Sequence, residues 1–264
     1  MTTARNAELA QELLVAAAQR TTVAPLRDRV ADMTLDDAYE IQSRQLDAHL
    51  AEGRSLVGRK IGLTSLAMQE QLGVDSPDFG FVLDTMVFSD GDTVNIDQFI
   101  APRAEPELAF VLSSPLQGPG VTRDDAVNAV SDVFAAIEII DSRVENWNIG
   151  LLDTVADNAS CGAIVVGREP LSVLPGATAA VEVELQINGD RVEGGRGDAV
   201  LGDPIAPLVW LANLLGERGV TLNAGEIILT GSFCRAAAIA EGDRVIADFG
   251  PLGALSVAFE RNNS

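Results

Sequence analysis

Three glutamates restrict the folds open to this chain more than any other feature. Glu105 and Glu107 lie in the apolar segment 103–112, and Glu138 lies in the apolar run 133–140. On an extended strand, residues i and i+2 point to the same face, so Glu105 and Glu107 are expected to project side by side. An ionised carboxylate such as that of Glu138 is costly to bury unless a cation or hydrogen-bond donors meet it. Any fold of this chain must therefore expose these carboxylates to water or supply cations or hydrogen-bond donors to them.

Two interpretations of the three glutamates are open. Convergent carboxylate oxygens form a hard site that suits Mg²⁺ or Mn²⁺. Alternatively, Glu105 and Glu107 are exposed strand acids and Glu138 is a hydrogen-bonded core residue, because short acidic pairs are common in proteins. The spacing alone does not decide between a metal site and these separate roles.

The charge balance restricts the partners of the chain. Its 264 residues carry 18 Lys+Arg and 39 Asp+Glu, a net charge of −21. A field of this sign repels nucleic acid and anionic lipid. It also repels carboxylate substrates, so an anionic ligand requires a local cation, either a metal ion or clustered basic side chains.

Cysteine and histidine usage excludes further classes. Cys161 and Cys234 are the only cysteines, and they form no C-x-x-C pair, which argues against a disulfide framework or a thiolate metal site. His49 is the only histidine, and its neighbours place it on the solvated side of a helix, so we do not expect it to be catalytic. The first residues lack a signal pattern and no apolar stretch reaches the ~18–20 residues of a membrane helix. We therefore expect a cytoplasmic protein that does not bind membranes.

The pattern along the chain predicts a mixed α and β protein. Residues 1–56 are expected to form a helical N-terminal region, in which Thr34–Asp37 resembles a capping box. Residues 57–264 are expected to form a strand-rich body crossed by helices. The local predictions for the body are a short helix from Thr64 to Gly73, a hairpin over Thr85–Ile96, a helix capped by Thr122, a hairpin at Asn188–Gly189 and a helix opened by Asp203–Pro204.

Two acid–base candidates precede the glutamates. Lys60 lies between Gly58 and Gly62 on an apolar strand. The glycines permit close approach to a ligand, and a partly desolvated lysine can take part in proton transfer, although an ordinary strand-edge lysine would look the same. Asp78 lies in a turn-like Pro-Asp-Phe-Gly segment, where it either stabilises the turn or acts as an acid–base partner.

Two polar segments are candidates for the walls of a pocket. Residues 153–162 combine acids, an amide and a serine before a buried strand, and they either cap their neighbours or line a pocket. Residues 230–235 end a strand with two hydroxyls and Arg235, a suitable set for binding a carboxylate.

Taken together, these segments resemble one protein family. The segments are Gly58-x-Lys60-Ile-Gly-Leu-Thr-Ser65, Pro77-Asp-Phe-Gly80, Pro102-Arg-x-Glu105-x-Glu107, Glu138-Ile-Ile-Asp-Ser-Arg143, Asp153 to Ser160 and Thr230-Gly-Ser232. In this order they are similar to the 2-keto-4-pentenoate (2-hydroxypenta-2,4-dienoate) hydratases of the fumarylacetoacetate-hydrolase superfamily. The resemblance covers about residues 35–260.

The resemblance implies a fold and a site. The family fold is α+β, a mixed β-sandwich roll with outer helices, usually assembled into homo-oligomers. It implies Mg²⁺ or Mn²⁺ on Glu105, Glu107 and Glu138, with Lys60 and Asp78 as catalytic residues in the same pocket. The candidates for holding the substrate carboxylates are Arg143, Ser160, Ser232 and Arg235.

The implied activity is addition of water to 2-hydroxy-2,4-dienoates in the meta-cleavage catabolism of aromatic compounds. The hydrolytic branch relies on a His-Glu pair in a lid segment, and the segment after Thr64 contains no histidine, so hydrolysis of a carbon–carbon bond is not expected. The alternatives are a 2-oxohept-4-ene-1,7-dioate hydratase, a 4-oxalocrotonate-type decarboxylase and, in a different class, a non-catalytic partner subunit. Association with a pathway decarboxylase or aldolase is a further expectation.

Overall fold

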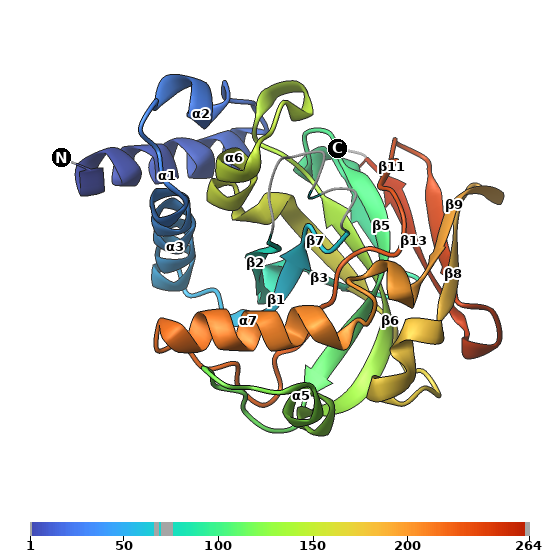
Figure 1. The fold of residues 1–264 in the computed structure, drawn as a ribbon. Helices are drawn as coiled ribbons and strands as arrows, with labels where there is room; N and C mark the ends of the chain where they lie inside the picture. Colours follow the sequence, from blue (N-terminus) through green and yellow to red (C-terminus); the bar gives the residue numbers. More distant parts are fainter. Residues whose placement is uncertain (1, 66–68, 70–75, 262–264) are drawn as a thin grey trace.

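The computed structural model describes residues 2–65, 69 and 76–261 (Figure 1). Its helices are α1 (Thr2–Gln19), α2 (Leu26–Arg29), α3 (Leu35–Ala51), α5 (Arg123–Ala129), α6 (Leu151–Ala156) and α7 (Ile205–Glu217). Its strands are β1 (Leu56–Gly62), β2 (Asp78–Leu83), β3 (Val87–Ser89), β4 (Thr93–Asn95), β5 (Arg103–Leu112), β6 (Val130–Ile140), β7 (Cys161–Val166), β8 (Glu182–Ile187), β9 (Asp190–Arg196), β10 (Ile227–Leu229), β11 (Ala237–Ala238), β12 (Arg244–Asp248) and β13 (Ala254–Glu260).

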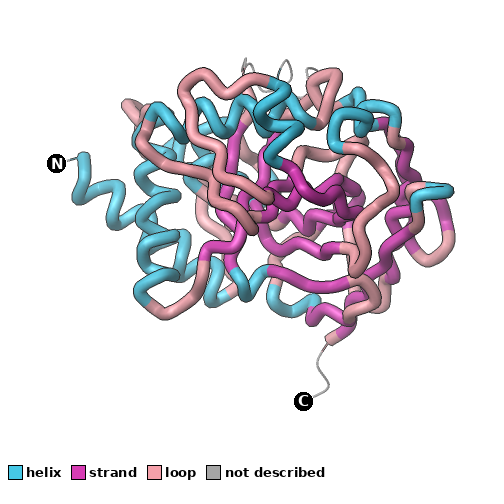
Figure 2. Tube along the Cα trace, turned by 90° about the horizontal axis from the view of Figure 1, so that it is seen from below, coloured by secondary structure: helices cyan, strands magenta, loops and turns pink. Residues whose placement is uncertain are grey.

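The strands form two mixed sheets. The larger has the order β2-β1-β10-β5-β6-β7-β3, with β11 also paired to β5, and the smaller has the order β4-β13-β12-β8-β9. The pairs β1–β10, β3–β7 and β4–β13 are parallel, and the other pairs are antiparallel. Most helical residues gather at the side of the molecule that holds the N-terminus, away from the smaller sheet (Figures 1 and 2). This arrangement confirms the predicted mixed sheet fold with outer helices.

The N-terminal helices join the rest of the molecule through their own hydrophobic cluster. Leu13 of α1 and Ile41 of α3 pack with Val155 and Ala156 of α6. The predicted capping box is present, because the Thr34 hydroxyl accepts from the Asp37 N–H and the Asp37 carboxylate accepts from the Thr34 N–H. None of the described helices is long and apolar enough to span a membrane.

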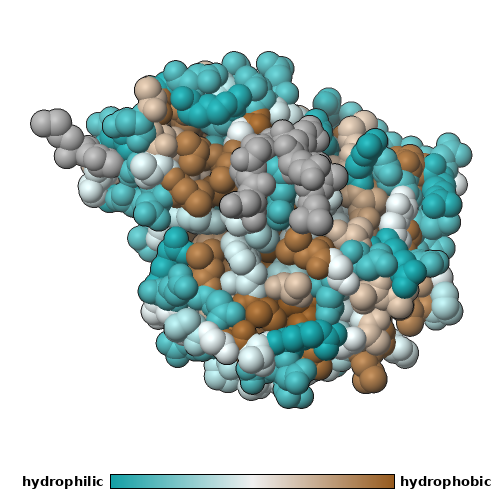
Figure 3. Space-filling view, viewed as in Figure 1, coloured by the Kyte–Doolittle hydropathy of each residue, from teal (hydrophilic) through white to brown (hydrophobic). Residues whose placement is uncertain are grey.

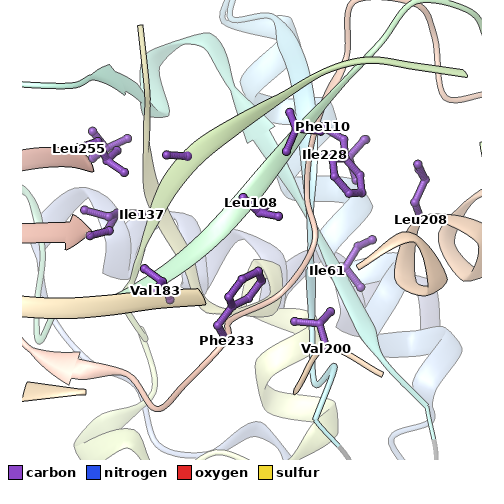
Figure 4. Close-up of a cluster of buried hydrophobic side chains, with 14 of the residues drawn as sticks. Ile61, Leu108, Phe110, Ile137, Val183, Val200, Leu208, Ile228, Phe233 and Leu255 are labelled. Carbon is purple, nitrogen blue, oxygen red and sulfur yellow. The ribbon is translucent and has the colours of Figure 1, made fainter. Parts of the chain in front are cut away.

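Side-chain alternation along the larger sheet separates a face in the main core from an opposite face. The opposite face, called the polar face below, carries the glutamates beside a smaller apolar cluster. On β5, Leu108 and Phe110 point into the main core between this sheet, α7 and the smaller sheet (Figure 4). The intervening residues of β5 point to the opposite face. On β6, Ile137 lies in the core and its neighbour Glu138 lies on that opposite face. The two strand faces thereby keep the carboxylates apart from the apolar core.

One local prediction is wrong, and the reason lies in the sheet order. The segment Thr85–Ile96 does not form a hairpin, since β3 pairs with β7 in the larger sheet and β4 pairs with β13 in the smaller one. The turn is present, with the Asp92 carboxylate accepting from the Ser89 N–H. It carries the chain from one sheet to the other, which turn residues alone cannot reveal. The predicted helix from Thr64 to Gly73 falls largely outside the described residues.

The other local predictions for the body are confirmed. Thr122 caps α5 with a capping box, Asn188–Gly189 connects the β8–β9 hairpin, and the Asp203 carboxylate accepts from the Ile205 N–H at the start of α7.

Apolar residues also reach the surface over α7 and beside the N-terminal helices, on a face that is otherwise largely hydrophilic (Figure 3).

A close contact ties the smaller sheet to the segment after β10. A Cβ atom on Gly195 of β9 would lie 1.9 Å from the backbone oxygen of Phe233. Phe233 is buried in the main core and follows directly on Gly231 and Ser232. The absence of a side chain at Gly195 therefore allows this segment to pass close beneath β9.

We predict that Gly195→Ala destabilises the fold by about 1–3 kcal/mol, because an added methyl group forces the two backbones apart. Urea unfolding measures this change. Gly167→Ala is the matched control, since its Cβ would meet nothing closer than 3.4 Å. Equal unfolding midpoints for the two variants would contradict the prediction.

Candidate metal centre and active site

The three glutamates converge on the polar face of the larger sheet. Glu105 on β5 lies directly opposite Glu138 on β6 in the antiparallel pairing. Glu107 follows two residues along β5 on the same face. Carboxylate oxygens of all three lie within 4.8 Å of one another. Glu107 and Glu138 are 1% and 0% exposed, whereas Glu105 is half-buried, so the cluster opens towards Glu105.

The protein supplies few donors to this cluster. Glu107 Oε2 accepts a 2.8 Å hydrogen bond from the N–H of Gly231. Both oxygens of Glu138 are buried, and their charged partner among the described residues is the ammonium group of Lys60, 3.2 Å from Oε1. Buried carboxylates in this state are normally ion-paired or bound to metal. The donor set therefore fits a divalent cation with oxygen ligands, such as Mg²⁺ or Mn²⁺.

Burial raises the pKa of all three glutamates, and repulsion within the cluster adds to the shifts of Glu105 and Glu107. Burial, followed by repulsion from Glu138, raises the pKa of Glu105 to about 7. Burial and the other two glutamates raise the pKa of Glu107 well above its usual range. Burial also raises the pKa of Glu138 although Lys60 opposes the shift. A bound cation would favour the ionised form of each carboxylate.

Lys60, on β1, is the positively charged group next to the glutamate cluster. The residue is 3% exposed, and Nζ lies 3.2 Å from Glu138 Oε1. Nζ also donates a 2.8 Å hydrogen bond to the backbone oxygen of Ala159. Burial by itself lowers the pKa of Lys60, but the charges of Glu138 and Asp78 outweigh burial and raise it. The structure therefore holds this amine as an ammonium ion.

Asp78 lies next to Lys60 at the start of β2. It pairs with Gly62 in the β1–β2 ladder, and its Oδ1 is buried without a hydrogen-bond donor among the described residues. A Cβ atom on Gly62 would lie 2.3 Å from Asp78 Oδ1 and 3.1 Å from Lys60 Nζ. Burial raises the pKa of Asp78, although Lys60 opposes the shift. Gly62 thus leaves the space in which an acid and an ammonium group meet beside the glutamates.

Ser232 and Arg235 follow Gly231, the glycine that contacts the glutamate cluster. The Gly231 N–H bonds Glu107, and Ser232 Oγ donates to the backbone oxygen of Cys234 at 2.8 Å. Arg235 is exposed, and none of the ion pairs found among the described residues involves it. The structure brings this segment to the cluster, whereas the substrate-binding roles of Ser232 and Arg235 stay predictions.

Ser160 and Arg143 are placed differently. Ser160 is buried, and its Oγ shares a 3.2 Å hydrogen bond with Thr154 Oγ1. The guanidinium group of Arg143 is buried against the Asp157 carboxylate and donates to the backbone oxygen of Cys161 at 3.4 Å. Arg143 is therefore already engaged by the protein, and the roles of Ser160 and Arg143 in binding a substrate carboxylate stay predictions.

Two features of the site go beyond what the sequence motifs indicated. Lys60 is the only lysine in the chain, a compositional signal that singles it out from the sequence alone. The backbone oxygen of Ala159 is the second feature, and no residue-type pattern could reveal it. His49 lies on α3 half-buried, with its ring 6.0 Å from that of Phe81, rather than on a fully solvated face.

Comparisons with known proteins identify the family of this chain. The model of the family "Fumarylacetoacetate (FAA) hydrolase C-terminal" matches residues 50–259. A 2-keto-4-pentenoate hydratase 1 of Dechloromonas aromatica (strain RCB) is 44% identical, with 96% of this chain and 97% of that protein covered. A 2-hydroxyhexa-2,4-dienoate hydratase of Comamonas testosteroni is 42% identical, with 94% and 95% covered.

A solved structure shares the fold and contains a bound divalent metal ion. The 4-oxalocrotonate decarboxylase from Pseudomonas putida G7, complexed with magnesium and adipate, is 35% identical with a TM-score of 0.94, and 98% of each chain is covered. A second structure of that protein contains calcium and acetate. The resemblance noted from the sequence motifs is thereby confirmed, and this chain belongs to the fumarylacetoacetate hydrolase family.

Proposed function

We propose that the chain is a metal-dependent hydratase that adds water to 2-hydroxy-2,4-dienoates in the meta-cleavage catabolism of aromatic compounds. Its reaction converts 2-hydroxypenta-2,4-dienoate to 4-hydroxy-2-oxopentanoate. The observation that carries the proposal is the buried cluster of three glutamates beside the ammonium group of Lys60. The similarity to curated hydratases over nearly the whole chain supports it.

Glu105, Glu107 and Glu138 would hold the Mg²⁺ or Mn²⁺ ion. When bound, the ion supplies a Lewis acid that polarises the C1 carboxylate and the C2 oxygen of the substrate. It also offsets the repulsion that a protein of net charge −21 exerts on an anionic substrate.

The chain's own residues move the protons. The dienol gains a proton at C5 and loses its hydroxyl proton to give a 2-oxo-3-alkene, and this alkene then gains a hydroxyl group at C4 and a proton at C3. In this scheme the Lys60 ammonium donates the protons that reach C5 and C3. The Asp78 carboxylate accepts the protons lost by the C2 hydroxyl and by the attacking water, and each returns to Lys60. The opposite charges of the two groups and their shared position at Gly62 support these roles.

Decarboxylation is the second candidate, and a specific observation favours it. The solved structure with a TM-score of 0.94 is a 4-oxalocrotonate decarboxylase, and loss of CO₂ from a 2-oxo-3-enedioate would use the same glutamates. A 2-oxohept-4-ene-1,7-dioate hydratase of Escherichia coli is 38% identical, so a longer diacid is a third substrate class. A non-catalytic subunit is disfavoured because a costly buried charge cluster serves no purpose without a ligand.

Substrate turnover distinguishes these activities. The isolated chain would be supplied with Mg²⁺ or Mn²⁺ and a panel of five-carbon and seven-carbon 2-hydroxydienoates, monoacid and diacid. Loss of diene absorbance measures the rate, and the product mass separates a gain of water from a loss of CO₂. We expect a gain of water. No turnover of the dienoates, or turnover only of an added 2-oxo-3-enedioate with loss of CO₂, would contradict the proposal.

We also propose a homo-oligomer in the cytoplasm. Apolar residues at the surface over α7 (Figure 3) support self-association. The free thiols of Cys161 and Cys234 support a reducing compartment. Association with a pathway decarboxylase or aldolase stays a prediction.

Removing one ligand charge is predicted to weaken metal binding without unfolding the chain. Glu138→Gln keeps the shape of the side chain but removes a charge from the ligand set. Its affinity for Mn²⁺, measured by calorimetry, should fall by at least about tenfold. Loss of a residue that only contacts a metal ligand already lowers metal affinity by about this factor. Glu217→Gln, at the exposed end of α7, removes the same charge and should bind normally. Equal Mn²⁺ affinities, or full activity after EDTA treatment, would rule out the metal site.

Lys60→Ala is predicted to impair the chemistry more than substrate binding. If Lys60 transfers a proton in the transition state, kcat should fall by roughly 10²-fold or more with little change in KM. Lys60→Arg tests charge separately, since arginine keeps the positive charge but does not release its proton in proteins. A variant with near-normal kcat would show that Lys60 only balances charge.

Arg235→Ala is predicted to discriminate between substrates. If Arg235 holds a distal carboxylate, its loss should cost ~2–4 kcal/mol for the seven-carbon diacid and little for the five-carbon monoacid. The exposed Arg191 on β9 supplies the control Arg191→Ala. We expect the monoacid to be the native substrate. A kcat/KM ratio that favours the diacid by more than about tenfold, or ~1.4 kcal/mol, would overturn that expectation.

A further inference from the structure

A left-handed turn lies directly against Lys60. The backbone φ angles of Asn158, Ala159 and Ser160 are 53°, 49° and 56°. Side chains disfavour this region, and three successive residues other than glycine rarely occupy it. Strained backbone of this kind persists only where the surroundings impose it, and it clusters at functional sites.

The side chain of Asn158 fastens the turn to β2. Its Nδ2 donates to the backbone oxygen of Phe81 at 3.0 Å, and its Oδ1 accepts from the Phe81 N–H at 2.8 Å. A Cβ atom on the neighbouring Gly80 would lie 2.5 Å from the backbone oxygen of Asn158. Gly80 is also the residue opposite Lys60 in the β1–β2 ladder. The turn therefore packs against β2, the strand that pairs with β1 at Lys60.

Arg143 fastens the two ends of the same turn. Its guanidinium group pairs with the Asp157 carboxylate, just before the turn, and donates to the backbone oxygen of Cys161 at 3.4 Å, just after it. The N–H of Asp141 donates to the backbone oxygen of Ser160 at 2.8 Å. The turn is thus held from β2 and from the end of β6 at once.

The group presented by this turn is the backbone oxygen of Ala159. It accepts from Lys60 Nζ at 2.8 Å, while Glu138 lies 3.2 Å from the same nitrogen. A lysine side chain has a flexible four-carbon stem, so its ammonium group has a defined position only where fixed acceptors hold it. The carbonyl oxygen is neutral and cannot move with respect to the turn.

We propose that the left-handed turn Asn158–Ser160 positions Lys60, and that Asn158 and Arg143 are positioning residues of the reaction. This inference rests on the proposed function, in which Lys60 transfers a proton. It also gives Arg143 a role in the site that requires no contact with substrate.

The single lysine of the chain makes the position of Lys60 directly measurable. Labelling the full-length protein with lysine carrying ¹³C at Cε gives one side-chain resonance, which reports the surroundings of Nζ without any activity. In Asn158→Ala we expect this resonance to shift or broaden. We expect kcat to fall roughly 10- to 100-fold, the scale of a misplaced catalytic group, while KM changes less than about threefold.

Asn213→Ala is the matched control. Asn213 also fastens a loop with its side chain, accepting from the N–H groups of Gly120 and Val121 and donating to the Val121 oxygen. It makes these contacts away from the glutamates and Lys60. This variant loses a comparable set of hydrogen bonds and should leave both kcat and the lysine resonance unchanged. If Asn158→Ala does not fold, Asn158→Gly loses the same side-chain bonds while favouring the left-handed backbone.

An unchanged lysine resonance in a folded Asn158 variant would overturn the proposal, whatever its activity. A shifted resonance with unchanged kcat would overturn it too, because position would then not matter to the reaction. A shift in the Asn213 variant as large as in the Asn158 variant would mean general loosening and would also overturn it. Failure of the proposed function is separate: the wild-type chain would turn over none of the dienoates, while its lysine resonance would still respond to Asn158→Ala.

Discussion

The ion pair between Lys60 and Glu138 is the interaction on which the site depends. One ammonium group faces four buried or half-buried acids: Asp78, Glu105, Glu107 and Glu138. A single positive charge cannot offset four negative ones, so the pKa values of the acids rise with burial. A bound divalent cation would reduce the charge of the ionised cluster from −3 to −1 and would lessen its repulsion of an anionic substrate. The same imbalance explains why the cluster is built where one side remains open, at Glu105.

The sheet order makes this charge arrangement possible. β1 and β2 carry Lys60 and Asp78, β5 and β6 carry the glutamates, and the four strands lie in one sheet separated only by β10. Alternation along each strand sends its polar side chain to one face and its apolar neighbours to the other. Ile61, Leu108 and Ile137 consequently seal the core directly behind the site. On each of these strands, alternate residues pack in the core and line the site.

The metal ligands do not by themselves choose the reaction. Curated hydratases and a decarboxylase both resemble the chain over nearly its full length, and both reactions begin from a polarised 2-oxo acid. The choice between water addition and CO₂ loss therefore lies in where protons are delivered and how the substrate tail is held. In the proposed mechanism, these two properties are set by Lys60, by the turn that contacts it and by the Gly231–Arg235 segment. Function follows the site rather than the fold.

Local sequence patterns determined much of the fold. The capping boxes at Thr34 and Thr122 and the hairpin at Asn188–Gly189 depend on neighbours a few residues away, and they formed as expected. The i, i+2 spacing of Glu105 and Glu107 determined that both point to one face. Their neighbouring motifs identified the family, and with it Glu138, Lys60 and Asp78 as one set.

Only the tertiary structure decided what depends on distant pairing. The turn at Ser89–Asp92 has hairpin chemistry, but its flanking strands pair with β7 and β13 in different sheets. The guanidinium group of Arg143 is suited to binding a substrate carboxylate, but the fold places the Asp157 carboxylate against it. The backbone oxygen of Ala159 has no residue-specific signature, so its contact with Lys60 arises only once a left-handed turn is pressed onto β2. Residue types determine which partners a group can accept, whereas the packing of remote segments determines which partner it meets.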